Sequence, residues 1–110
     1  MADTPAGNEV DLTGTTAVTL VSAPTSGQRF IPSGGISFYN ADTVSRTLTI
    51  QKKIDTTVYV VEKLTLTTLT TGKSTVPIVL DDTDEIVEVV SDATATTTEP
   101  QATAAFMETS

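Results

Sequence analysis

Residues 44–62 read VSRTLTIQKKIDTTVYVVE, a pattern typical of a β-hairpin. In the first half, polar and apolar side chains alternate, so that Leu48 and Ile50 fall on one face of an extended strand. Asp55 begins a turn, because Asp hydrogen-bonds to its own backbone and tolerates turn geometry. Residues 57–62 are again mostly β-branched or aromatic, as in a second strand. The stretch therefore predicts two antiparallel strands.

The rest of the chain has the same composition. It contains 24 Thr, 12 Val and 6 Ile, so 42 of its 110 residues are β-branched. Such side chains are stiff at χ1 and pack well on a pleated sheet, whereas they lose freedom in a helix. No window sustains the apolar spacing of an amphipathic helix, while alternation with a period of two recurs. We therefore predict an all-β chain.

Turn clusters divide the sequence into about eight short strands. We place them at residues 15–22, 28–40, 44–53, 57–62, 63–68, 74–80, 85–91 and 101–107. The second strand path contains Gly34 and Gly35, which predict a bulge or a tight bend within it. Short strands at this spacing are typical of a sandwich or barrel. We predict an antiparallel β-sandwich of jelly-roll type.

The N-terminal segment differs from the strands. Residues 1–14 are polar and are punctuated by Pro5, Gly7 and Gly14. We therefore expect an extended N-terminal arm outside the sandwich, followed by a single β-sandwich domain over residues 15–110.

Two places are expected to dock onto a partner protein. The arm could add a strand to an exposed sheet edge of the partner, with Val10 and Leu12 as its apolar residues. Pro77 lies inside a predicted strand but cannot donate to a β-ladder, so this strand is expected at a sheet edge or at a bulge. We therefore predict that Val10, Leu12 and Pro77 contribute to docking.

Several function classes are excluded by what the chain lacks. It has no Cys, His or Trp, which removes disulfides, thiolate or imidazole metal sites and Ser-His-Asp catalysis. The net charge of −8 argues against nucleic acid or an anionic membrane as a partner. No segment has the composition of a secretory signal or of a transmembrane helix. We expect no enzyme activity, no catalytic residues and no cofactor.

The acidic run near residue 81 is the best candidate for a metal site. Asp81, Asp82 and Asp84, followed by Glu85, supply the oxygen ligands that calcium prefers. Their spacing lacks the glycine and the distant Glu of a 12-residue calcium loop. Asp-rich turns between strands are also common for local hydrogen-bonding reasons. A calcium site and a plain turn both remain open.

The charges are unevenly distributed along the chain. Residues 29–73 carry a net charge of +3, whereas residues 1–28 carry −3 and residues 74–110 carry −8. A molecule of this kind could associate with copies of itself. Alternatively, the charges only cover solvated strand faces.

Tyr39 is the aromatic residue most clearly expected at the surface. It follows Phe38, so a buried Phe38 places Tyr39 on the opposite face of the strand. An exposed ring at Tyr39 or Tyr59 could serve a carbohydrate- or receptor-binding module. A ring that only packs at the rim of the sandwich is the simpler interpretation.

The turns carry a resemblance to a known class of proteins. They include NADT at residues 40–43, LDDTD at residues 80–84 and TTTEP at residues 96–100, the last before QATAAFME. Together with ISFYNADTVSRTLTIQ at residues 36–51, these motifs resemble small accessory structural proteins of tailed bacteriophages. The resemblance covers residues 15–108 and does not extend to the N-terminal segment.

This resemblance implies a β-sandwich in the virion, as a head decoration, head-fibre, neck or tail component. It further implies the major capsid protein or other virion proteins as partners, and self-association as a trimer or hexamer. The chain would be made in the host cytoplasm and located in the virion. The alternative function is a carbohydrate- or receptor-binding module on a fibre or cell-surface protein.

Overall fold

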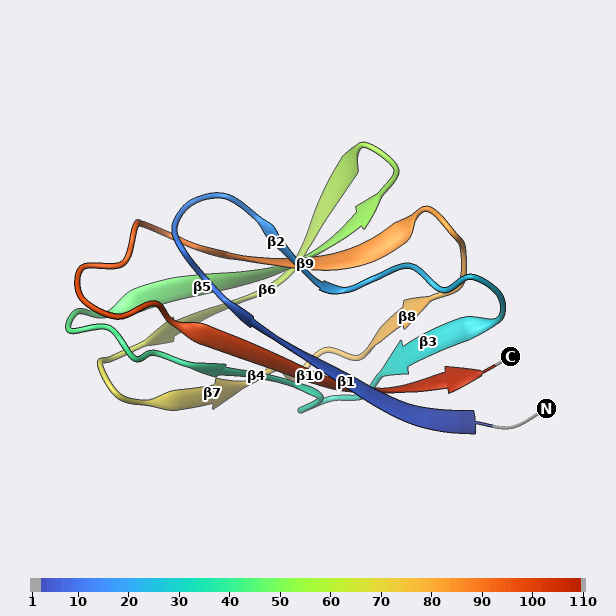
Figure 1. Ribbon diagram of the computed structural model, residues 1–110, viewed down its shortest axis with the longest axis horizontal. Coiled ribbons are helices and arrows are strands. Elements are labelled where there is room, and N and C mark those ends of the chain that lie inside the picture. The colour runs from blue at the N-terminus through green and yellow to red at the C-terminus, as the bar shows by residue number, and fades with distance from the viewer. Residues whose placement is uncertain (1–2, 110) are drawn as a thin grey trace.

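The computed structural model describes residues 3–109, and this range contains ten β-strands and no helix (Figure 1). The prediction of an all-β chain is therefore confirmed. The strands are β1 (Asp3–Asp11), β2 (Val18–Val21), β3 (Gln28–Ile31), β4 (Ile36–Tyr39), β5 (Arg46–Ile54), β6 (Thr57–Leu66), β7 (Thr71–Lys73), β8 (Ile78–Leu80), β9 (Glu85–Ser91) and β10 (Gln101–Thr109).

The strands form two antiparallel sheets. Sheet B has the order β2-β9-β5-β6, and the larger sheet A contains β1, β3, β4, β7, β8 and β10. In sheet A, β3 and β4 pair with successive parts of β10, while β8 and β7 pair with their outer sides. Sheet A therefore consists of four strand paths, namely β1, β10, β3/β4 and β7/β8.

The path of β3/β4 bends where the sequence predicts a bend. Residues 32–35 separate the two strands, and Gly34 has a φ of 79°, a conformation that glycine adopts without steric cost. The backbone N–H of Ala105 in β10 donates to the carbonyl oxygen of Gly35 at 2.8 Å. The bend thus interrupts the strand path without detaching it from β10.

Eight strand paths, four in each sheet, wind around one another. The first path pairs with the last, the second with the seventh, the third with the sixth, and the fourth with the fifth. This wound arrangement of antiparallel pairs is that of a jelly roll. The predicted fold class, an antiparallel β-sandwich of jelly-roll type, agrees with the structure.

The core lies between the two sheets and is made of alternate strand residues. On β10, Ala102, Ala104 and Phe106 point inward, while the residues between them are exposed. Leu48 and Ile50 of β5 are fully buried on the facing sheet. Burial of each large apolar side chain contributes about 1.5–3 kcal/mol to folding.

The N-terminal segment is part of the sandwich, which corrects the expectation of an external arm over residues 1–14. Within the described residues, β1 pairs with β10 along its whole length, from Asp3 opposite Thr109 to Asp11 opposite Gln101. Leu12 then enters the core and has no exposed surface. Main-chain pairing with β10 holds this polar strand in place, so apolar alternation is not needed. Residues 1 and 2 lie outside the described range, as does residue 110.

Other strands also differ from the prediction, and β7 lies in a segment where no strand was expected. The segments expected as separate strands at residues 57–62 and 63–68 form one strand, β6, with an irregularity opposite Ile50 and Gln51. The strand expected at residues 74–80 begins at Ile78, directly after Pro77.

Candidate interaction surfaces

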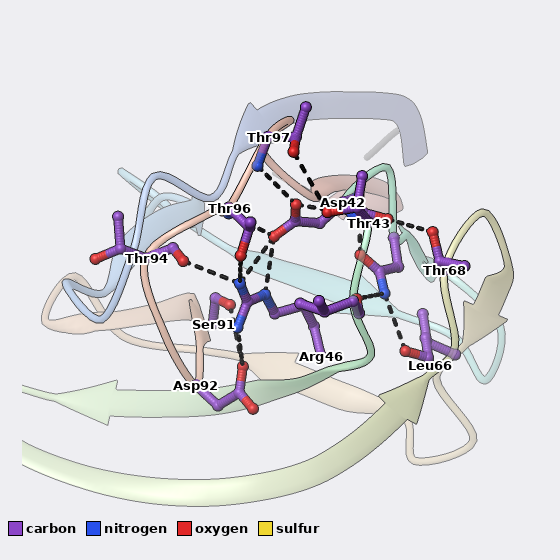
Figure 2. A network of polar contacts seen from close by, with 12 residues as sticks. Asp42, Thr43, Arg46, Leu66, Thr68, Ser91, Asp92, Thr94, Thr96 and Thr97 are labelled. Atoms are coloured by element: carbon purple, nitrogen blue, oxygen red, sulfur yellow. Dashed lines mark hydrogen bonds and ion pairs between the residues drawn. The ribbon is translucent and has the colours of Figure 1, made fainter.

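A buried polar network closes one end of the sandwich (Figure 2). Asp42 follows β4 and is fully buried. One carboxylate oxygen accepts hydrogen bonds from the backbone N–H groups of Thr43 (2.8 Å) and Thr97 (2.9 Å). The other accepts from the N–H of Thr96 (2.8 Å) and from Nε (3.0 Å) and Nη2 (2.9 Å) of Arg46. The bond from Thr96 is the largest of the causes that hold the pKa of Asp42 well below its ordinary range, and they outweigh the effect of burial.

Arg46 and Asn40 extend this network to two other loops. The guanidinium of Arg46 also donates to the carbonyl oxygen of Thr94 (3.0 Å) and to Oγ1 of Thr96 (2.9 Å). Nδ2 of Asn40 donates to the carbonyl oxygens of Val44 (2.9 Å) and Leu66 (3.0 Å). The network therefore ties the turn after β4 to the ends of β6 and β9. Its polar groups form hydrogen bonds with one another, so the network stabilises the fold from within.

The acidic run after β8 forms a turn. Glu85 is 7% exposed. Its Oε1 accepts a hydrogen bond from the N–H of Asp81 at 2.8 Å, and its Oε2 lies 3.4 Å from Nζ of Lys52. Asp82 accepts from the N–H of Thr83 at 2.7 Å. Across residues 3–109, no three His, Cys, Asp or Glu side chains are grouped to hold a metal ion. Asp81, Asp82 and Asp84 are therefore not grouped as a set of three ligands in the structure.

The pKa values of Asp81 and Glu85 at this turn are shifted in opposite directions. A hydrogen bond with Glu85, together with the charge of Glu85, raises the pKa of Asp81. Burial alone would raise the pKa of Glu85, but hydrogen bonds from Asp81 and the ammonium group of Lys52 outweigh it and lower that pKa. Contacts with Asp81 and Lys52 thus stabilise the ionised form of Glu85.

The predicted docking residues do not share a surface. Leu12 is fully buried, so its side chain is not presented to a partner, and this corrects its assignment as a docking residue. Val10 is half-buried against the core, on a strand of sheet A rather than on a free arm. Pro77 is exposed and lies directly before β8, which forms part of an edge of sheet A, as predicted.

Both tyrosines reach the surface. Tyr39 is 37% exposed, whereas Phe38 is fully buried, so the predicted orientation of Tyr39 is confirmed. In the register of sheet A, Tyr39 lies between Gln101 of β10 and Thr71 of β7. Tyr59 of β6 is more exposed, at 54%.

The tip of the β5–β6 hairpin exposes apolar side chains on consecutive strand residues. This tip projects beyond the body of the sandwich (Figure 1). Val58, Tyr59 and Val60 are 45%, 54% and 57% exposed, respectively. Within the described residues, β6 pairs only with β5, so its outer edge is open. The run TVYVV, which contains no charge and no Pro, is the signal in the sequence that could have identified this surface.

No protein-family model matches the chain, and no curated protein matches it with significance. In the part of the chain that the structure describes, no helix is long and apolar enough to cross a membrane.

Proposed function

We propose that this chain is a non-enzymatic structural protein of a tailed-phage virion, which decorates or stabilises the capsid, neck or tail. It would act through contacts with the major capsid protein or another virion protein and through self-association. The resemblance of its turn motifs to phage accessory proteins supports this proposal. Jelly rolls are also common in viral capsid proteins, an argument from analogy of fold.

The exposed apolar segment of β6 is the observation that carries the proposal. An open edge strand presents unpaired N–H and C=O groups, and natural proteins usually protect such an edge with charge, Pro or a covering element. Here the three residues at the edge, Val58, Tyr59 and Val60, are apolar or aromatic and exposed. An extended segment of a virion protein could pair with this edge and cover these side chains.

The charge around β6 specifies the kind of segment that fits. Lys53 lies opposite Val58 on β5, and Lys63 is exposed further along β6. Neither lysine takes part in an ion pair among residues 3–109. An extended partner segment with acidic residues beside its apolar ones would therefore complement this edge.

Incorporation into phage particles tests the proposed function. A tagged chain would be produced during infection, and particles purified on a density gradient would be assayed for the chain by quantitative mass spectrometry. We expect the chain in the particles, and we expect Val60→Lys to reduce its amount at least tenfold. Val44→Lys is a matched control, because Val44 is 42% exposed but lies at the opposite end of the hairpin. Absence of the unmodified chain from the particles would contradict the proposal.

The exposure of Tyr59 favours a second candidate function, carbohydrate or receptor binding. A ring that is 54% exposed on a projecting hairpin is accessible for stacking against a sugar. A glycan array, followed by titration up to millimolar concentrations, tests this function. Binding that is lost in Tyr59→Ala would support it, and the absence of any ligand would exclude it.

A further inference from the structure

The outward face of sheet A carries two rows of residues that cross all four strand paths. The first, the apolar row, consists of Pro5, Met107, Phe30 and Val79, which lie opposite one another on β1, β10, β3 and β8. The second, the polar row, consists of Glu9, Thr103, Ser37 and Lys73 on β1, β10, β4 and β7.

The apolar row is exposed although its chain neighbours form the core. Phe30, Val79 and Met107 are 42%, 39% and 36% exposed, respectively. Ile31 and Leu80, the next residues after two of them, are fully buried. Strand alternation therefore places the row on the outer face of the sheet. A contiguous row of this kind, four strands wide, is unusual on a face directed only at water.

Small residues separate the two rows. Gly7 of β1 lies opposite Ala105 of β10, midway between the rows. Nothing larger than a methyl group projects from these two positions, so another sheet can approach to the usual spacing of about 10 Å.

The polar row has opposite charges at its two ends. Glu9 and Lys73 are both exposed, and neither takes part in an ion pair or a side-chain hydrogen bond among residues 3–109. Three strand spacings separate them, a distance of about 14 Å, which is too far for a direct contact within one molecule. The row is therefore complementary in charge to a second row of the same kind that runs in reverse.

We propose that two copies of this chain associate through this face, about a two-fold axis that runs parallel to the strands. This axis places β1 of one copy over the β7/β8 path of the other and keeps each row at the same height. The apolar row then covers its own symmetry mate, and Glu9 of each copy faces Lys73 of the other. A two-fold axis across the strands would instead place the apolar row over the polar row.

The size of the face determines the strength of the dimer. Four strand paths at 4.8 Å and six residues at 3.4 Å give an area of roughly 400 Å² per copy. Stable interfaces bury about 800 Å² per partner, so this contact forms a weak dimer that depends on concentration. Copies held close together on a particle would associate more readily than copies in dilute solution.

This inference rests on the proposed function, because it identifies a surface for the self-association that the function includes. The two ideas can still fail separately. A chain that is monomeric in solution but present in phage particles overturns the dimer alone. A dimer that depends on Glu9 and Lys73 but is absent from particles overturns the virion function alone.

Sedimentation velocity at low ionic strength tests the dimer. We expect the mean mass to rise from 11.5 kDa toward twice this value as concentration increases from micromolar to millimolar. Glu9→Lys and Lys73→Glu should each prevent this rise, because each places like charges at both ends of the row. An equimolar mixture of the two variants should restore it, because every pair is then of opposite charge.

Two further variants test the apolar row and control for a change of charge outside this face. Phe30→Thr removes the largest side chain of the apolar row without changing charge, and it should also prevent the rise. Asp84→Lys, in the exposed turn between β8 and β9 and outside this face, makes the same charge change as Glu9→Lys and should leave association unchanged. The proposal is overturned if the unmodified chain stays monomeric at millimolar concentration. It is also overturned if a trimer or hexamer forms that ignores the substitutions at Glu9 and Lys73, or if the mixture fails to associate.

Discussion

The two ends of the β5–β6 hairpin reverse the usual distribution of polar and apolar residues. Where β5 begins, Arg46 is 7% exposed and binds the fully buried Asp42 at 2.9 Å. Beyond the other end of β5, Val58, Tyr59 and Val60 of β6 are each about half exposed. One hairpin thus buries charge at one end and exposes apolar surface at the other.

The buried end of the hairpin contributes to the stability of the fold, whereas the exposed end offers surface to a partner. A buried ion pair costs several kcal/mol in desolvation per ion, and it persists only when further hydrogen bonds satisfy it, as at Asp42. Its groups are therefore committed to the fold. The apolar side chains at the tip gain nothing from the core, but they contribute about 25 cal/mol for each Å² that a partner covers. Substitutions at the two ends should consequently change different measurements.

The largest effect is expected from Arg46→Met at the buried end. The substitution leaves the carboxylate of Asp42 without its cation in a site closed to water, which costs roughly 3–5 kcal/mol of unfolding free energy. Chemical denaturation followed by circular dichroism measures this loss. A loss below about 1 kcal/mol would indicate that the backbone N–H groups alone satisfy Asp42.

Leu12→Ala is expected to have a similar or slightly smaller effect. Leu12 is fully buried, and its N–H donates to the carbonyl oxygen of Pro100 at 2.8 Å, so truncation creates a cavity that costs about 2–5 kcal/mol. Denaturation against Val76→Ala, at a residue that is 40% exposed, supplies the control. Equal stabilities of the two variants would restore the idea of a dispensable N-terminal arm.

Acid should lower the free energy of unfolding, because the fold depends on the ionised carboxylate of Asp42. Because the pKa of Asp42 is lower in the folded chain than in the unfolded chain, the unfolded state binds a proton first as the pH falls below about 4. The contribution of Asp42 to the free energy of unfolding should therefore be fully present above this pH and decrease below it. Asp42→Asn removes the titrating group, so its stability should depend less on pH between 4 and 2. An unchanged pH dependence in this variant would show that other carboxyl groups cause the acid sensitivity.

Substitution at the tip should have the smallest effect on stability. Val60→Thr keeps the β-branched shape but makes the exposed edge more polar, and it should change the unfolding free energy by less than about 0.5 kcal/mol. The same variant should reduce recovery of the chain in purified phage particles. A large decrease in the free energy of unfolding would instead show that the Val60 side chain stabilises the folded chain.

The sequence predicts strands best where period-two alternation meets clear turns. The predicted strand at residues 85–91 has the same bounds as β9, and the strand path predicted at residues 28–40 bends at Gly34 and Gly35 between β3 and β4. The first strand was missed because Pro5, Gly7 and the acidic residues of β1 are typical of a loop. Its strand conformation depends on pairing with β10, a contact about 100 residues away in sequence that no local pattern contains.

The surfaces were less predictable than the strands. Exposure of Tyr39 follows from alternation with Phe38, and both agree with the structure. Arg46 looked like an ordinary polar residue, and its burial depends on loops that meet only in the fold. Exposure of Val58 and Val60 depends on how far the hairpin extends beyond the neighbouring sheet, which strand propensity does not encode.

Hydrogen exchange on the isolated chain tests most directly the claim that one end of the hairpin is committed to the fold and the other is open. The N–H groups of Thr96 and Thr97, although in a loop, donate to the buried carboxylate of Asp42. We predict that they exchange nearly as slowly as the amides of the core strands, whereas those amides of residues 58–60 that point away from β5, on the open edge of β6, exchange fast. Fast exchange at Thr96 and Thr97, together with protection along the edge of β6, would contradict this account.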